Sequence, residues 1–110
     1  MLLQVNNTRI SEAWNIGIEK STGEIIYFLN SDDVLNDDEV FSKVINVFNT
    51  YECNIIMGNI LYVNNKNKII RNWKININEN KIISQNEICN FLKMGWMPPH
   101  PGFFIHRDII

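Results

Sequence analysis

The stretch EIIYFLNSDD, residues 24–33, decides the fold of this chain. After Glu24 it is continuously apolar up to Leu29 and rich in β-branched and aromatic side chains, a pattern typical of a central strand covered on both faces. Polar residues follow at once. The ligand crevice of an open α/β sheet lies at the carboxyl ends of its strands, so residues 30–33 are expected to face a site.

The pair Asp32 and Asp33 has two interpretations. Two adjacent carboxylates after a buried strand are costly unless they bind a cation or accept hydrogen bonds. Hard divalent cations prefer oxygen ligands, and Mg²⁺ or Mn²⁺ typically takes one or two carboxylates together with phosphate oxygens of a substrate. The other interpretation is that these residues and Ser31 only form a turn that caps the next segment. The tetrapeptide alone leaves both open.

Apolar periodicity predicts the elements around this strand. A helix over residues 10–21 is expected to be capped by Thr8 and ended by Gly23. Further predictions are a helix from residue 36 or 37 to about 51, a buried strand over 54–58 and a hairpin over 60–63 and 69–73. Towards the end of the chain we expect a helix over 85–93, a proline-rich loop over 97–102 and a strand over 102–105. The helix over 85–93 is expected to bury Ile88, Phe91 and Leu92. The predicted fold class is α/β, with a mixed sheet and helices on its faces, in one domain over residues 1–110.

The composition excludes several classes of protein. The chain has 110 residues, 45% of them hydrophobic, which suits one modest domain. With a formal charge of −2, we expect no basic surface for nucleic acid or anionic lipid. No segment has the pattern of a signal peptide or the length of a transmembrane helix. Cys53 and Cys89 lack metal-ligand spacing, so we expect reduced thiols in a cytoplasmic protein.

Two separated segments, residues 10–35 and 97–107, resemble the family 2 glycosyltransferases of the GT-A fold. That family has a helix with an Asn-x-Gly-Ile pattern, here starting at Asn15, and then a short turn and a strand ending in Leu-(Asp/Asn)-(Ser/Ala)-Asp-Asp. The later segment, MPPHPGFFIHR, resembles part of a bacterial surface-polysaccharide branch. The resemblance implies a partial, Rossmann-like GT-A domain. It further implies inverting transfer of a sugar from a nucleotide-diphosphate donor to a glycan or lipid-linked acceptor.

The resemblance also implies roles for single residues. Asp32 matches the carboxylate of the family's DxD-type motif that coordinates Mg²⁺ or Mn²⁺ on the donor diphosphate. Asn30 takes the first motif position, usually Asp, where it would contact ribose or sugar without adding charge. Asp33 would support or order the loop. Asn15 would line the donor pocket from its helix.

Other polar and aromatic residues are candidates for the acceptor side. His100, fixed between two prolines, is either held over the acceptor or the metal, or it only shapes the turn. Trp96 is the candidate platform for a sugar ring, whereas Trp14 on the apolar helix stripe is expected in the core. His106 is expected at the surface. No residue matches the family's general base, which is expected beyond Ile110.

The strand and acidic loop with which the family begins have no counterpart here, so we expect a domain shortened at both ends. Exposed strand edges and apolar helix faces would then favour an oligomer or a covering partner. The expected location is the cytoplasm, either free or peripheral at the inner face of the membrane. One alternative is an inactive remnant that at most binds a partner or glycan. Another is a nucleotidyl- or phosphotransferase, which would need a GxxxxGK[ST] or GxGxxG loop that is absent.

Overall fold

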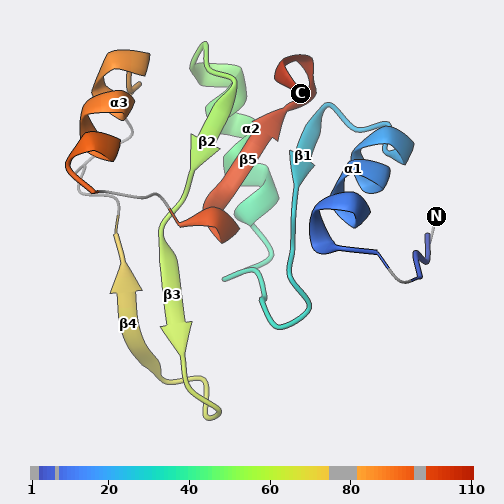
Figure 1. The fold of residues 1–110 in the computed structure, drawn as a ribbon. Coiled ribbons are helices and arrows are strands. Elements are labelled where there is room, and N and C mark those ends of the chain that lie inside the picture. The colour runs from blue at the N-terminus through green and yellow to red at the C-terminus, as the bar shows by residue number, and fades with distance from the viewer. Residues whose placement is uncertain (1–2, 7, 75–81, 96–98) are drawn as a thin grey trace.

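The computed structural model describes residues 3–6, 8–74, 82–95 and 99–110 (Figure 1). Its helices are α1 (Ile10–Lys20), α2 (Val40–Thr50) and α3 (Gln85–Lys93). Its strands are β1 (Ile25–Tyr27), β2 (Ile55–Met57), β3 (Ile60–Val63), β4 (Ile69–Trp73) and β5 (Phe103–His106). The 3₁₀ turns η1 (His100–Gly102) and η2 (Arg107–Ile109) flank β5. Each helix and strand expected from the apolar periodicity is present, several with shifted ends.

β5 is the central strand of a three-stranded sheet and lies between β1 and β2. Both ladders are antiparallel: Phe104 of β5 pairs with Tyr27 on one side and with Ile56 on the other. β1 and β2 therefore run in the same direction, and their carboxyl ends lie at the lower edge of the sheet in Figure 1, where η1 leads into β5. The prediction that β1 is a central strand is wrong within the described residues, because it forms an edge of this sheet.

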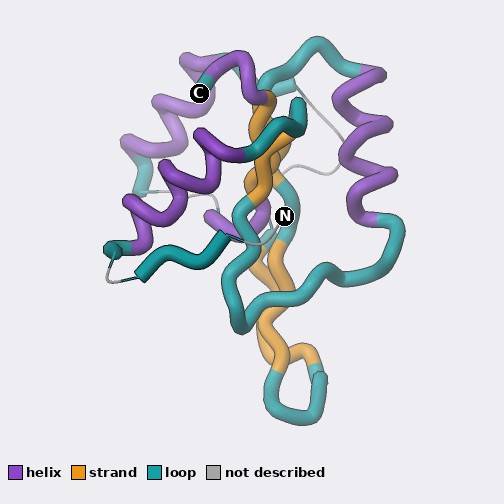
Figure 2. The backbone as a smooth tube through the Cα atoms, turned by 90° about the vertical axis from the view of Figure 1, so that its right-hand side faces the viewer, coloured by secondary structure: helices purple, strands orange, loops and turns teal. Residues whose placement is uncertain are grey.

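Helices cover both faces of the sheet (Figure 2). On one face, Tyr27 stacks on Phe104 with ring centroids 4.4 Å apart, and Phe41 of α2 meets both rings edge-on. Side chains alternate between the faces of an extended chain, so the next residue, Phe28, points the other way. Its ring lies 4.7 Å from that of Trp14 in α1. The α/β class with helices on the faces of the sheet is confirmed.

The hydrophobic interior is small. Among the described residues, the buried hydrophobic side chains are Ile26, Val44 and Phe104. Complete burial of such a side chain contributes about 1.5–3 kcal/mol, so few contacts carry the fold. Three residues predicted to be buried are exposed, Leu29 at 52%, Ile55 at 44% and Leu92 at 45%. Leu29 lies beyond the end of β1, and β2, which contains Ile55, is an edge strand of its sheet. None of the residues of α3 is buried.

Arg107 joins the end of β5 to the end of α1. Its guanidinium donates to the carbonyl oxygens of Gly23 at 2.7 Å and Ser21 at 2.9 Å, and it also contacts the Ser21 hydroxyl. A cation at this position suits the negative end of the helix dipole. The prediction that Gly23 ends the helix is wrong, because α1 ends at Lys20 with Ser21 in extended conformation as its cap.

The helix starts differ in how well local sequence signals predicted them. The N-cap of α1 is Arg9 and not Thr8, and its N–H donates to Glu12 Oε2 at 3.3 Å. At α3, the Ser84 N–H donates to Glu87 Oε2 at 2.9 Å, and the Glu87 N–H donates to Ser84 Oγ at 3.3 Å. This reciprocal capping box follows from the Ser-x-x-Glu spacing. It gives Glu87 a structural role.

Candidate functional site

The acidic loop, residues 30–33, follows β1 closely and closes on itself. Asn30 Nδ2 donates to Asp33 Oδ2 at 2.8 Å, and the Asp33 N–H donates to the Asn30 carbonyl oxygen at 3.1 Å. The turn that one interpretation expected at residues 31–33 is therefore present. Asp32 is exposed, and it makes no hydrogen bond or ion pair within the described part of the chain. Of the two carboxylates in this loop, only that of Asp33 accepts a hydrogen bond from a described residue.

The turn η1 brings residues from the far end of the sequence to the carboxyl end of β1, just before this loop. Tyr27 Oη donates to the Pro101 carbonyl oxygen at 3.0 Å. Burial and, to a smaller extent, the charge of Asp33 raise the pKa of Tyr27, so its hydroxyl stays protonated as the donor of this bond. The ladder between β1 and β5 stops at Tyr27 because η1 turns the partner backbone away. Residues 28 and 29 leave the sheet for this reason, although the apolar pattern continues to Leu29.

His100 lies flat on the indole of Trp14. Their ring centroids are 4.8 Å apart and their planes differ by 7°. The turn beneath is fixed by the Gly102 N–H, which donates to the carbonyl oxygen of buried Pro99 at 3.0 Å. His100 itself is exposed, so its ring stays accessible to a ligand. Trp14, expected in the core, is half-buried between Phe28 and His100.

Two glycines set the distance between η1 and the end of β2. The Gly58 N–H donates to the Gly102 carbonyl oxygen at 2.8 Å. A Cβ added at Gly102 would overlap the Gly58 carbonyl oxygen and lie 3.1 Å from its carbon. A Cβ added at Gly58 would meet the Gly102 oxygen at 3.6 Å, an ordinary contact. The lower edge of the sheet therefore depends on the missing side chain at Gly102 in particular.

The carboxylates of Asp32 and Asp33 are the oxygen ligands that a divalent cation would meet at this edge. Within the described ranges, no group of three or more His, Cys, Asp or Glu side chains is arranged to hold a metal ion. One oxygen of Asp33 already accepts from Asn30. This set does not form a cage built from protein alone. It does fit Mg²⁺ or Mn²⁺, which keep water and substrate phosphate oxygens as further ligands.

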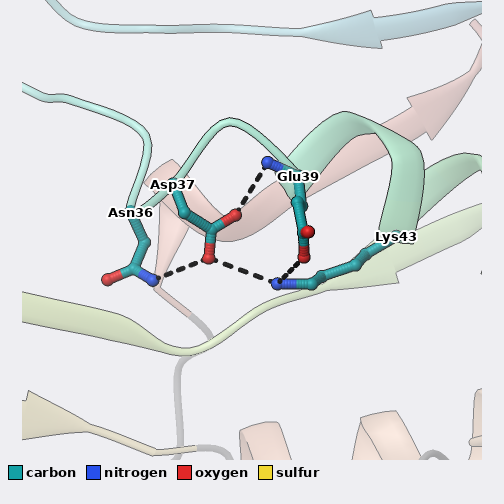
Figure 3. A network of polar contacts seen from close by, with 4 residues as sticks. All are labelled: Asn36, Asp37, Glu39 and Lys43. Atoms are coloured by element: carbon teal, nitrogen blue, oxygen red, sulfur yellow. Dashed lines mark hydrogen bonds and ion pairs between the residues drawn. The ribbon is translucent and has the colours of Figure 1, made fainter.

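A polar network at the start of α2 orders the chain after the acidic loop (Figure 3). Asp37 Oδ1 accepts from the Glu39 N–H at 2.9 Å, and Asp37 Oδ2 accepts from Asn36 Nδ2 at 3.1 Å and from Lys43 Nζ at 3.2 Å. The bond from Lys43, and next the bond from the Glu39 N–H, lower the pKa of Asp37. Because this turn precedes Val40, the helix starts later than predicted. Asp37 and Glu39 are thus held in a polar network ahead of the helix, and the N-cap residue Glu39 makes no side-chain capping bond.

The other predicted site residues are less closely grouped. Asn15 is exposed on α1, next to Trp14. Trp96 lies outside the described residues. The prediction that His106 lies at the surface is wrong. Its side chain is 30% exposed and its ring lies 6.1 Å from Phe48, because β5 extends to this residue and turns it towards α2.

A hollow of about 650 Å³ lies at the opposite edge of the sheet. Phe48, Cys53 and His106 are among its lining residues, and none of the predicted site residues lines it. Burial raises the pKa of the Cys53 thiol, which makes this cysteine a poorer nucleophile at neutral pH. Cys53 and Cys89 are both free thiols. The acidic loop remains the candidate site, because it follows the carboxyl end of β1, where the ligand crevice of an open α/β sheet lies.

The comparisons with known proteins are consistent with this assignment. The model of glycosyl transferase family 2 matches residues 1–109, a range that includes α1, the acidic loop and η1. No curated protein and no solved structure matches the chain significantly. None of the helices in the described part is both long enough and apolar enough to cross a membrane.

Proposed function

The chain belongs to glycosyl transferase family 2, and we propose that it transfers a sugar from a nucleotide-diphosphate donor to an acceptor hydroxyl at the acidic loop. One observation carries this proposal. The exposed Asp32 carboxylate and the accessible His100 loop lie at the same edge of the sheet, joined through Tyr27 and Pro101. A diphosphate donor and its acceptor need such an edge, with carboxylates for a metal–phosphate group and polar side chains beside it.

We assign the donor side to the acidic loop. Asp32 would hold Mg²⁺ or Mn²⁺, and Asp33 would add a second negative charge nearby. When bound, the cation neutralises the charge that develops on the departing nucleoside diphosphate. Asn30 keeps Asp33 oriented through its amide group, 2.8 Å from the carboxylate. Its side-chain oxygen is thereby left to accept a hydrogen bond from a donor hydroxyl. Asn15, exposed on α1, would line the same pocket.

The acceptor side is assigned to η1, where His100 is exposed. We propose a glycan or lipid-linked acceptor whose hydroxyl attacks the sugar in line, which inverts the anomeric centre. The resemblance of residues 97–107 to the surface-polysaccharide branch supports a product of that class of glycan. We further propose a location in the cytoplasm that is peripheral at the inner face of the membrane.

Release of nucleoside diphosphate from a panel of uridine, guanosine and thymidine diphosphohexoses tests the proposal. With Mn²⁺ we expect one donor class to be turned over at least about tenfold faster than in EDTA, since the metal stabilises the leaving group. The alternative, an inactive remnant that at most binds a partner or glycan, is favoured by the small interior and the exposed apolar side chains. It predicts no release from any donor and no Mn²⁺-dependent binding of nucleoside diphosphate by calorimetry. That result would overturn sugar transfer at the acidic loop.

A further inference from the structure

The β3–β4 hairpin stands apart from the rest of the fold. Its strands form a separate two-stranded sheet, and in both views it extends beyond the lower end of the three-stranded sheet (Figures 1 and 2). Large apolar side chains are exposed on both of its faces, and that of Ile70 is 65% exposed. These exposed residues are Leu61, Tyr62, Val63, Ile69 and Ile70. A two-stranded sheet with apolar groups on both faces is unusual in water and indicates a contact surface.

The charge of the hairpin is opposite to that of the remaining chain. Residues 60–74 hold four of the ten Lys and Arg residues and none of the twelve Asp and Glu residues. The hairpin segment therefore carries a charge of +4, and the remainder carries −6. The uniform positive charge on an apolar projection is the composition that anionic lipid surfaces attract.

The tip and base of the hairpin are ordered by local contacts. At the tip, Asn64 Oδ1 accepts from the N–H groups of Lys66 and Lys68 at 2.9 and 3.0 Å. Towards the base, the Arg71 guanidinium lies 5.6 Å from the ring centre of Tyr62 and 5.5 Å from that of Trp73. Aromatic rings beside a cation suit the boundary between headgroups and acyl chains. The hairpin therefore presents lysines, aliphatic side chains and aromatic rings on one projecting element.

We propose that the β3–β4 hairpin docks this protein onto an anionic lipid bilayer. Its aliphatic side chains would enter the interfacial region while its lysines meet anionic headgroups. A second copy is a poorer occupant, because two hairpins of charge +4 would repel each other. Nucleic acid would use the charges and leave the aliphatic residues in water. This inference rests on the proposed membrane location and is independent of sugar transfer.

Vesicle flotation with the full chain tests the proposal. Vesicles of phosphatidylcholine with about a third phosphatidylglycerol are compared with vesicles of phosphatidylcholine alone. We expect binding to the anionic vesicles, reduced by salt. The double variant Lys66→Gln/Lys68→Gln should weaken binding roughly 30-fold, since each basic residue near the surface contributes about fivefold. The matched control Lys20→Gln/Lys93→Gln makes the same change in charge on α1 and α3 and should bind like the unmodified chain.

The variant Ile70→Ser tests the apolar contribution without changing the charge. Because Ile70 is 65% exposed, its loss should leave the thermal melt unchanged and weaken vesicle binding about tenfold. Equal losses in the hairpin and control double variants would overturn the proposal, as would equal binding to neutral vesicles. Self-association in the absence of lipid that the hairpin variants abolish would assign the surface to a second copy instead. The hairpin variants are also tested for binding of nucleoside diphosphate. If they lose vesicle binding but still bind the nucleotide, the loss concerns the hairpin and not the proposed sugar transfer.

Discussion

Replacing Asp32 by Asn is expected to lower Mn²⁺-dependent transfer roughly 10²–10³-fold, the loss typical when one group that stabilises developing charge is removed. Asp32 makes no contact that the fold needs within the described residues, so the free energy of unfolding should change by less than about 0.5 kcal/mol. The loss should appear equally in calorimetric binding of nucleoside diphosphate with Mn²⁺. Release of nucleoside diphosphate, calorimetry and a thermal melt together measure these effects.

The control for this substitution is Asp38→Asn. Asp38 is exposed beside the polar network that precedes α2 and carries the same charge as Asp32, but it lies outside the acidic loop. Its replacement should leave binding and transfer within about twofold of the unmodified chain, because a distant exposed charge is screened by salt. Retention of metal-dependent binding by Asp32→Asn, or an equal loss in both variants, would remove Asp32 from the site.

The second large effect is expected at Gly102. A methyl group there would overlap the carbonyl oxygen of Gly58 and lie 3.1 Å from its carbon, so the backbone of η1 or β2 would have to move. We expect Gly102→Ala to lower the free energy of unfolding by about 3 kcal/mol, the upper end of the usual cost of overpacking. That is a large share of the 5–15 kcal/mol typical of a domain. Urea unfolding followed by circular dichroism measures the change.

Gly58→Ala is the matched control, since its added methyl group would meet the Gly102 oxygen at 3.6 Å. We expect a change of less than about 1 kcal/mol, part of it a gain from the reduced freedom of the unfolded chain. Movement of η1 in Gly102→Ala should also displace His100 from Trp14 and so weaken acceptor use. Equal unfolding midpoints for the two variants would show that the close approach of the two glycines does not constrain the fold.

Much of the secondary structure could be predicted from local sequence. The bounds of the β3–β4 hairpin and of α3 agree with the prediction, because alternation, turn residues and helical periodicity are all short-range signals. The end of β1 could not be predicted in this way. It depends on η1, whose Pro101 accepts the bond from Tyr27 across 74 residues. The cap that Arg107 provides for α1 is equally remote in sequence.

The candidate site was predicted in part for the same reason. Residues 30–33 follow a strong strand pattern, so their position at a carboxyl edge could be inferred from the sequence. The bond between Asn30 and Asp33 spans three residues and is a local turn signal that the side-chain types allow. The stack of His100 on Trp14 joins two segments that are distant in sequence, and no local sequence pattern predicts it. The partial burial of His106 was not predicted, because the length of β5 depends on its partner strands.

The most direct test of the acidic loop as the metal–diphosphate site is paramagnetic broadening of backbone amide signals in NMR spectra. Substoichiometric Mn²⁺ is added to the isotope-labelled chain with and without nucleoside diphosphate. The predicted result is that broadening is strongest at residues 30–33, extends to Gly102, and increases when the nucleotide is present. Broadening centred on Cys53 and His106, at the hollow on the opposite edge of the sheet, would contradict the assignment.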